Sequence, residues 1–346
     1  MASPDVIPQA PPDQPGAANS RSTPGPAGSV ALRPRNRGAA IASVLVWVTV
    51  GSTLLLLMVT LLGRTVRDPP LFLVGAVTFL PYLFLLQVSW SLVLWAVLRR
   101  RRLIPLSLSG VFGVALLNWG PAWFSRGEQA DGESLTMMSW NVRRLWGGAA
   151  SGDPGVCVIE VIKEVNPDVV TLLEITRNDL AILEPALGMS CVHGTYTKGG
   201  GDGHGGLASC VRGNRWKLAG GKAMRFVDNE DWYYVFSEVE RSGKVLNVLA
   251  VHLYPYGSAI AGIRATEVVK AQGGQSAALL HRVARFKDPT VVSGDFNSTR
   301  DAALHASLRG HMVDVWEKAG RGFGGASRYL EWIPLRIDYI YVTEEL

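Results

Sequence analysis

Three long apolar stretches near the start of the chain constrain its fold more than any other feature. They occupy residues 41–63, 71–98 and 103–124 of the 346-residue sequence. At about 1.5 Å of rise per helical residue, each is long enough to cross a hydrocarbon core of about 30 Å. A soluble protein of this size has no core large enough for so much apolar sequence. We therefore expect three transmembrane helices within residues 39–124.

The segments on either side of these stretches are polar. Residues 1–38 are rich in Pro, Gly, Ala and Ser, a composition typical of a disordered tail. The apolar sequence begins too late, and runs too long, for a cleaved signal peptide. Residues 125–134 form a polar linker, and residues 135–346 are long enough for one soluble domain.

Arginines flanking the apolar stretches predict the orientation of the chain. Three lie between residues 33 and 37, and four lie at 99–102, whereas the loop at 64–70 has two. Cytoplasmic loops carry the excess of positive charge, so the N-terminus and the four-arginine loop belong in the cytoplasm. Three crossings then place residue 125 onward outside it. We expect a multi-pass protein of the cell membrane, in contact with the lipid bilayer, with an extracytoplasmic domain.

The basic isoelectric point of about 9.2 does not describe the soluble domain. Residues 1–124 hold 10 Lys and Arg against 3 Asp and Glu, whereas residues 126–346 hold 24 against 26. Non-specific nucleic-acid binding depends on a concentration of positive charge. The near-neutral domain therefore makes nucleic acid a less favoured partner.

The three cysteines give little indication of a metal site. Cys157, Cys191 and Cys210 form no Cys-x-x-Cys pair, which argues against zinc. One disulfide among them is compatible with an exported domain, but an odd count leaves one thiol over. We expect buried free thiols.

The soluble segment alternates short apolar runs with helical patterns. An amphipathic helix over 155–166 ends at Asn166-Pro167, and Ser242-Gly243 marks the turn of a hairpin over 233–253. A further helix covers 259–286. Strands are expected at 135–142, 167–175, 289–297 and 336–342. This pattern predicts an α/β domain with polar residues gathered at its strand ends.

Six polar side chains stand at these strand ends. They are Asn141, Glu174, His252, Asp295, Asn297 and Asp338. Three carboxylates, two amides and an imidazole, without a thiolate, suit a hard cation such as Mg²⁺ or Mn²⁺. In an extended strand Asp295 and Asn297 point to the same side while Phe296 points to the other. Burying such convergent polar groups is costly unless they bind something.

The segments MSWNV, NPDVVTLLEI, VHL, SGDFN and RIDYIYV, in this order, resemble the endonuclease/exonuclease/phosphatase superfamily over residues 135–346. The resemblance implies a two-sheet β-sandwich flanked by helices, here preceded by the three transmembrane helices, with a metal-dependent phosphoester site. It implies that Glu174 binds the metal, assisted by Asn141, and that Asp295 orients or deprotonates the attacking water. By the same resemblance, Asn297 and His252 hydrogen-bond the phosphate and Asp338 completes the polar network.

The superfamily pattern closes with a Ser-Asp-His motif one strand after the IDYI segment, and its histidine binds the scissile phosphate. The 346-residue sequence reaches Leu346 without that motif. The resemblance therefore implies a C-terminally incomplete catalytic domain over residues 135–346.

Three apolar spans joined to such a domain resemble bacterial membrane phosphatases linked to glycopeptide resistance, which act on undecaprenyl pyrophosphate. The resemblance implies a membrane-anchored, Mg²⁺-dependent hydrolase of phosphoesters or pyrophosphates, acting outside the cytoplasm on a phosphorylated, lipid-linked substrate. Two alternatives stay open. One is a nuclease of the same superfamily, and the other is a catalytically dead membrane protein that binds its ligand without the terminal histidine.

Overall fold

The computed structural model describes the chain from residue 37 to residue 346 with several gaps. The described ranges are 37–67, 69–98, 103–124, 134–143, 154–195, 205–227, 232–259, 263–320, 327–330 and 333–346. The chain divides into two units, Met1–Ile41 and Ala42–Leu346. The predicted disordered tail at 1–38 and the linker at 125–134 lie almost wholly outside the described residues.

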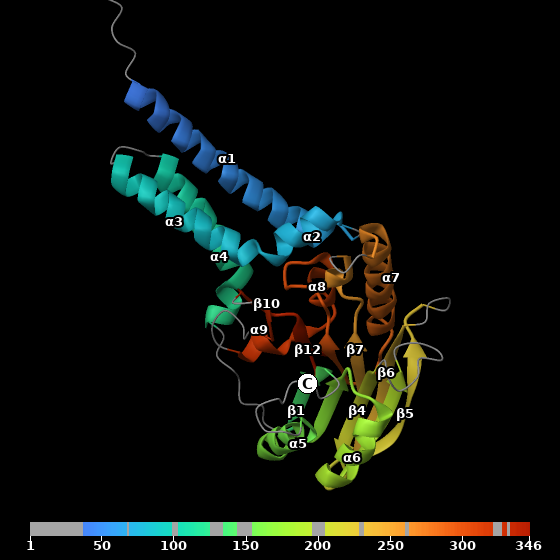
Figure 1. The fold of residues 1–346 in the computed structure, drawn as a ribbon. Coiled ribbons are helices and arrows are strands. Elements are labelled where there is room, and N and C mark those ends of the chain that lie inside the picture. Colours follow the sequence, from blue (N-terminus) through green and yellow to red (C-terminus); the bar gives the residue numbers. More distant parts are fainter. Residues whose placement is uncertain are drawn as a thin grey trace, which may run out of the picture. The chain divides into compact units, whose positions relative to one another are not determined.

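Four helices form the first part of the described chain (Figure 1). They are α1 (Arg37–Thr65), α2 (Leu71–Thr78), α3 (Leu80–Leu98) and α4 (Leu103–Phe124). By length and composition, α1 from Gly38 to Thr65 and α3 could cross a membrane, and no other described helix meets that criterion. The prediction of three spans is therefore corrected to two candidates. The third predicted span forms α4, several of whose side chains lie outside the described residues.

The second apolar stretch, expected as one helix over 71–98, is interrupted at Phe79. The helix α2 ends there, with the Phe79 N–H still bonded to the Gly75 carbonyl at 3.1 Å. Pro81 has no N–H to donate to Val77, and its ring disfavours a helical conformation at the residue before it. Proline thus divides an apolar sequence whose composition alone suggested a continuous helix.

A cluster of neutral polar side chains joins α1, α3 and α4. Gln87 donates to the carbonyl oxygen of Thr49 at 3.0 Å and to Thr53 Oγ1 at 2.9 Å, and it accepts from Ser52 at 2.9 Å. Thr53 Oγ1 also lies 2.6 Å from Ser107 Oγ on α4. Both N–H groups and the oxygen of Gln87 are therefore bonded. We call these five residues the Gln87 cluster.

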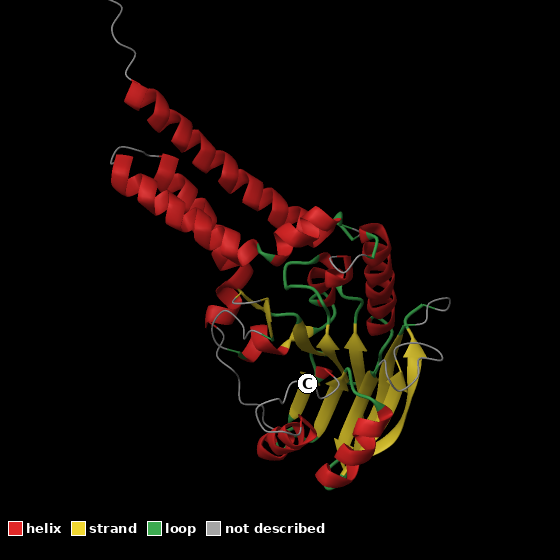
Figure 2. Ribbon diagram, in the orientation of Figure 1, coloured by secondary structure: helices red, strands yellow, loops and turns green. Residues whose placement is uncertain are grey.

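Two β-sheets form the framework of the remaining domain (Figure 2). The first has the order β1-β2-β4-β3, and the second has the order β5-β6-β7-β8-β12-β9. The strands are β1 (Met137–Asn141), β2 (Val169–Leu173), β3 (Met189–Thr195), β4 (Gly206–Arg212), β5 (Lys217–Arg225), β6 (Tyr233–Arg241), β7 (Lys244–His252), β8 (Thr290–Asp295), β9 (Val313–Asp314) and β12 (Asp338–Val342), with β10 (Arg328–Leu330) and β11 (Ile333–Leu335) in a separate hairpin.

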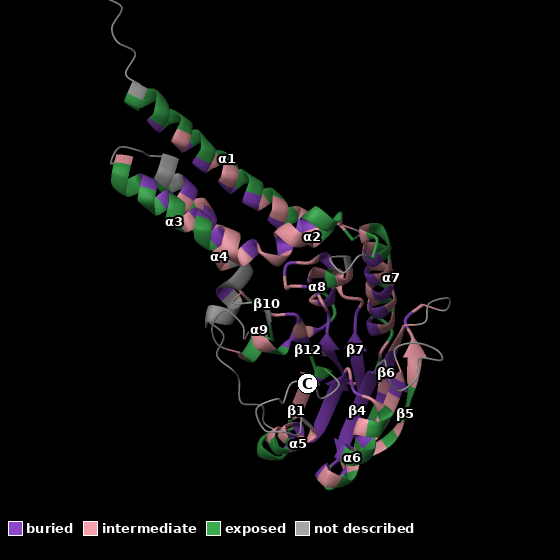
Figure 3. Ribbon diagram, viewed as in Figure 1, coloured by how far each residue is buried: buried purple, intermediate pink, exposed green. Residues whose placement is uncertain are grey.

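The two sheets pack face to face and helices cover their outer faces. On the first sheet, α5 (Pro154–Val165) and α6 (Arg177–Leu187) contact outward side chains such as Val170 and Leu172. On the second, α7 (Ala265–Val283) and α8 (Ala303–Leu308) pack over β7, β8 and β12. The short helices α9 (Val315–Ala319) and Tyr256–Ala259 complete the domain. The strands β2, β4, β7 and β8 are buried in the middle of this four-layer arrangement, which confirms the predicted two-sheet α/β fold (Figure 3).

Local sequence signals account for several element boundaries. Asn166, with φ of 50°, takes a left-handed conformation after α5, and Pro167 prevents further helix. Ser242 and Gly243 both have positive φ, 53° and 77°, as a tight hairpin turn between right-twisted strands requires. The helix end and the hairpin predicted from sequence are thus confirmed.

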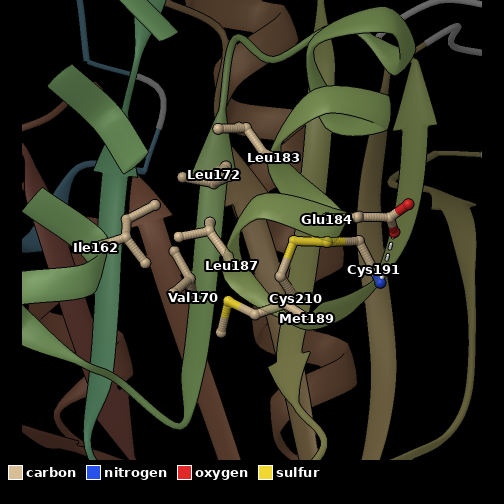
Figure 4. A pocket seen from close by; sticks show the side chains of 9 residues that line it. All are labelled: Ile162, Val170, Leu172, Leu183, Glu184, Leu187, Met189, Cys191 and Cys210. Atoms are coloured by element: carbon tan, nitrogen blue, oxygen red, sulfur yellow. Dashed lines mark hydrogen bonds between the residues drawn. A yellow bond between two sulfur atoms is a disulfide. The ribbon is translucent and has the colours of Figure 1, made fainter. Parts of the chain in front are cut away.

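The expectation of free thiols is wrong for two of the three cysteines. Cys191 on β3 and Cys210 on β4 form a disulfide, while Cys157 is free. The two are paired residues of antiparallel neighbours, with Cα atoms 4.0 Å apart, a pairing that sequence spacing does not reveal. Figure 4 shows the disulfide among apolar side chains of α5, α6, β2 and β3, with Glu184 accepting a hydrogen bond from the Cys191 N–H at 2.9 Å.

A buried histidine connects the end of β8 to β12. His305 lies on α8, with Nε2 3.0 Å from Ser298 Oγ and Nδ1 2.8 Å from Tyr341 Oη. Its ring is fully buried, and this burial lowers its pKa well below the ordinary value. The ring is therefore neutral and both nitrogens have partners. We call Ser298, His305 and Tyr341 the His305 cluster.

Candidate active site

The six polar residues predicted from the sequence come together where the two sheets meet. In the first sheet, β1 and β2 run parallel, and Asn141 is opposite Leu173, the last residue of β2. Asn141 therefore lies beside Glu174 and Ile175, the two residues that follow β2, which we call the Glu174 turn. In the second sheet, Asp295 at the end of β8 is paired with His252 on β7 and with Asp338 on β12. Strand pairing therefore places residues from five separate segments at one edge of the domain.

Asn141 connects the carboxylates of the two sheets. Its side-chain nitrogen donates to Glu174 Oε1 at 2.9 Å and lies 3.4 Å from Asp295 Oδ2. Its oxygen accepts from the backbone N–H of Arg143 at 3.1 Å. In this arrangement Asn141 acts as a hydrogen-bond donor, and an amide nitrogen does not bind Mg²⁺. Ligation of a metal by Asn141 would require the amide to rotate and present its oxygen.

The turn after β8 fixes the Asp295 carboxylate. The backbone N–H of Asn297 donates to Asp295 Oδ1 at 2.7 Å, and the Asn297 side chain donates to the Leu253 carbonyl at 2.9 Å. Phe296 points the other way and is fully buried in the core. Gly294 is required here because a Cβ atom would lie 1.9 Å from the Val251 carbonyl oxygen.

Left-handed backbone conformations are concentrated at this edge. Among the described residues, five that are not glycine have positive φ, and Arg143 (46°), Glu174 (55°) and Asn297 (47°) are three of them. For a residue with a Cβ atom this conformation costs about 1 kcal/mol or more. Backbone strain of this kind persists where the surrounding contacts over-determine it, and it is often found at functional sites.

Burial removes water from the carboxylates of the site, and few neighbouring groups compensate their negative charge. It raises the pKa of Asp295 to about 6, and the neighbouring Glu174 charge adds to the effect. It raises the pKa of Asp338 to about 7, again with help from a like charge, that of Asp295. The Oδ1 atom of Asp338 is buried without a hydrogen-bond partner among the described residues. These carboxylates would gain free energy from a cation or a proton.

His252 is a neutral member of the site. Its Nε2 lies 3.8 Å from Asp295 Oδ2, beyond hydrogen-bond distance. Burial lowers the pKa of His252, although the charges of Glu174 and Asp338 oppose this effect. The contact with Asp295 is therefore no ion pair near neutral pH. The backbone of His252 is held by Trp232, whose indole N–H donates to the His252 carbonyl at 2.6 Å.

Two site residues have no signal in the strand-end pattern. Ser327 Oγ accepts from the backbone N–H groups of Ile337 and Asp338 at 2.9 and 3.0 Å, which holds the start of β12. The next residue, Arg328, is exposed, and its positive charge lowers the pKa values of His252, Asp295 and Asp338. Both lie where the hairpin β10–β11 begins, and no sequence pattern predicted that hairpin.

The donor set fits a divalent cation of the Mg²⁺ type. Within the described ranges, no group of three or more His, Cys, Asp or Glu side chains is close enough to enclose a metal by itself. Mg²⁺, however, is usually held by one or two carboxylates, with water and substrate phosphate completing its shell. Glu174 supplies one such carboxylate beside the Asn141 amide, and Asp295 lies close by on the same amide. Among the described residues, the buried Asp338 Oδ1 also has no hydrogen-bond partner.

Several solved structures resemble part of this chain in fold. One solved structure, an endonuclease/exonuclease/phosphatase family protein from Bacteroides thetaiotaomicron, is 17% identical, covers 62% of this chain and 85% of its own, and has a TM-score of 0.50. A mannosyl-6-phosphatase of the same organism is 18% identical, covering 61% and 86%, with a TM-score of 0.48. A zebrafish (D. rerio) TDP2 complexed with a single-strand DNA product is 19% identical, covering 60% and 83%, with a TM-score of 0.48.

The family of this chain is shown by sequence comparison alone. No curated protein sequence matches the chain. The profile of the Endonuclease/Exonuclease/phosphatase family matches residues 138–346, which is more than half of the sequence. This protein therefore belongs to the endonuclease/exonuclease/phosphatase family, whose members are generally phosphoester hydrolases.

Proposed function

We propose that this chain is a membrane-anchored, Mg²⁺-dependent hydrolase that cleaves a lipid-linked pyrophosphate. The observation that carries the proposal is the bridge from Asn141 to Glu174 and Asp295, which brings carboxylates of two sheets to one edge. The raised pKa values of Asp295 and Asp338 support it, because a bound cation would offset the same uncompensated charge. Mn²⁺ has similar ligand preferences and is the alternative metal.

In the proposed reaction Asp295 is the general base. Glu174, with Asn141 after rotation of its amide, would hold the metal, which supplies positive charge to stabilise the phosphoryl group in the transition state. Asp295 accepts a proton from the attacking water while the new oxygen–phosphorus bond forms and the bond to the leaving phosphate breaks. Without a metal, burial raises the pKa of Asp295 to about 6, and a bound cation would lower it again, so that the carboxylate is ionised and able to accept a proton at neutral pH.

The remaining site residues orient the phosphate. In the proposal, neutral His252 and the Asn297 amide would donate N–H groups to phosphate oxygens. Asp338 completes the polar network beside the metal. The exposed Arg328 adds the positive charge that a second phosphate group would need.

The lipid-linked substrate and the cellular location are linked parts of the proposal. The two candidate spans support attachment to a membrane. The Cys191–Cys210 disulfide supports an oxidising compartment, outside the cytoplasm. That location needs an odd number of crossings from a cytoplasmic N-terminus, which is one more or one fewer than the two candidates. A C-terminal alkaline phosphatase fusion should be active and a C-terminal GFP fusion dark. A fluorescent GFP fusion would place the domain in the cytoplasm.

Phosphate release from a lipid pyrophosphate tests the function directly. The full chain in detergent should release phosphate from undecaprenyl pyrophosphate with Mg²⁺ and lose this activity in EDTA. Glu174→Ala should lose it as well, whereas Glu240→Ala, at an exposed position on β6, should retain it. Activity of Glu174→Ala equal to that of the wild type would rule out the proposed site.

Two further outcomes distinguish the alternatives. Nicking of plasmid DNA without action on the lipid, falling steeply with salt, would identify a nuclease. The near-neutral charge of the domain argues against that result. Binding of the lipid pyrophosphate without turnover at saturating Mg²⁺ would identify a binding protein.

A further inference from the structure

The backbone beside Glu174 contacts a histidine that the proposed mechanism does not use. His193 lies on β3, and its Nε2 is 3.2 Å from the carbonyl oxygen of Ile175. A carbonyl oxygen only accepts, so the ring carries a proton on Nε2 in this contact. Since Ile175 directly follows Glu174, the bond is made one residue away from the carboxylate proposed to hold the metal.

Further hydrogen bonds restrain the same stretch of backbone. The N–H of Ile175 donates to the carbonyl of Gly206 at 3.1 Å, so both backbone polar groups of Ile175 are bonded. On the other side of Glu174, the Leu173 carbonyl accepts from Val142 at 3.0 Å. Glu174, with φ of 55°, therefore lies between two restrained peptides. A glutamate keeps a left-handed backbone conformation only where neighbouring contacts restrain it in this way.

Gly206 leaves the space through which the ring reaches Ile175. In the β3–β4 pairing, His193 is opposite Ala208 and Thr195 is opposite Gly206. A Cβ atom on Gly206 would lie 2.7 Å from His193 Nε2 and 2.3 Å from the carbonyl oxygen of Gly194. The absence of a side chain at Gly206 is therefore a condition of the contact between His193 and Ile175.

We propose that His193 is a positioning residue that fixes the left-handed backbone of Glu174 and thereby directs its carboxylate toward the metal. The role in metal binding rests on the proposed function, whereas the backbone restraint does not. The hydrogen bond acts through Ile175, so the side chain of His193 need not touch metal or substrate. Substitutions that remove the donor should release the Glu174 turn while leaving the sheets intact.

Three substitutions separate the hydrogen bond from simple packing. His193→Leu removes the donor, and His193→Gln keeps an N–H near the position of Nε2. His311→Leu, at an exposed histidine, is the matched control. Hydrogen exchange of the Ile175 amide reports the restraint without metal or substrate. It should be at least tenfold faster in His193→Leu and close to wild type in the other two variants.

Calorimetric titration with Mg²⁺ in the absence of substrate measures the consequence for the site. Loss of a residue that orients a metal ligand typically weakens metal affinity by about 10- to 100-fold. We expect a loss of about tenfold in His193→Leu, recovery in His193→Gln and no change in His311→Leu. At saturating Mg²⁺ the KM for the lipid pyrophosphate should remain that of the wild type.

Each outcome decides a different step. Unchanged exchange of Ile175 in His193→Leu overturns the inference, whatever the metal result. Faster exchange with unchanged Mg²⁺ affinity overturns the link to metal binding. Equal impairment of His193→Gln and His193→Leu assigns the effect to packing and also overturns the inference. A wild-type chain that neither binds Mg²⁺ nor releases phosphate refutes the proposed function, while the exchange data still decide whether His193 restrains Glu174.

Discussion

The Gln87 cluster and the active-site cluster are both groups of polar side chains inside the protein, but they differ in how well they are satisfied. Every hydrogen-bonding atom of the Gln87 side chain has a partner within the cluster, and none of its members is charged. At the active site, carboxylates of both sheets converge, and a buried oxygen of Asp338 has no partner among the described residues. A satisfied cluster stabilises packing, whereas an unsatisfied one is suited to bind a ligand.

The sharpest test of this difference is Asp295→Asn. The substitution keeps the shape of the side chain but removes the general base, so kcat should fall by about 10³-fold. Stability of the metal-free protein should not fall, because a buried and poorly compensated carboxylate is replaced by a neutral amide. Initial rates and thermal unfolding check both parts, with Asp288→Asn at an exposed position as the control. Full activity would refute the role of Asp295.

The His305 cluster extends the comparison to a satisfied group within the catalytic domain. The pKa of His305 in the folded protein lies well below the unfolded value of about 6.5. The neutral histidine therefore makes its whole contribution to the free energy of unfolding above about pH 6.5. As pH falls below about 6.5, protons bind the unfolded chain first, and stability falls by at most about 1.4 kcal/mol per pH unit.

His305→Gln should flatten this pH dependence, because the amide can hydrogen-bond without titrating. Denaturant unfolding followed by tryptophan fluorescence between pH 7 and 5 (a range set by the unfolded histidine pKa of about 6.5) measures the effect. His311→Gln, at an exposed position, is the control and should keep the wild-type slope. An unchanged slope in His305→Gln would mean that another group is responsible.

The smallest effect is expected for Gln87→Leu. It should lower the stability of the helical region by about 1 kcal/mol, the usual net contribution of a hydrogen bond. The loss is small because the Thr53 hydroxyl already donates to the Thr49 carbonyl at 2.9 Å, and the Ser52 hydroxyl can turn from Gln87 to the same carbonyl, 3.0 Å away. Unfolding in mixed micelles with SDS measures it. Phosphate release per folded molecule should stay unchanged, and its loss would show that the two clusters are coupled.

Much of the domain was predictable because its sequence signals are local. Asn166-Pro167 ended a helix and Ser242-Gly243 formed a hairpin turn, as their conformational preferences require. The six site residues were found because each follows or ends an apolar strand. Pro81 was an equally local signal for the break in the second apolar stretch, but composition over a long window concealed it. The roles assigned to the six residues remain predictions.

Pairing between distant segments was not predictable in this way. The disulfide depends on Cys191 and Cys210 being opposite each other across β3 and β4. Ser327 and Arg328 reach the site through the hairpin β10–β11, which has no strong periodic pattern. His193 contacts the Glu174 turn only because Gly206 leaves room for its ring.

The sequence by itself determined the apolar helices, the alternation of strands and helices, and which chemical groups stand at the strand ends. These properties depend on neighbouring residues and on the period of the backbone. The tertiary structure alone decided which strand ends meet, which amide atom faces which carboxylate, and which carboxyl groups are left without compensation. Those properties depend on distances between residues far apart in the chain, and so on how the two sheets pack.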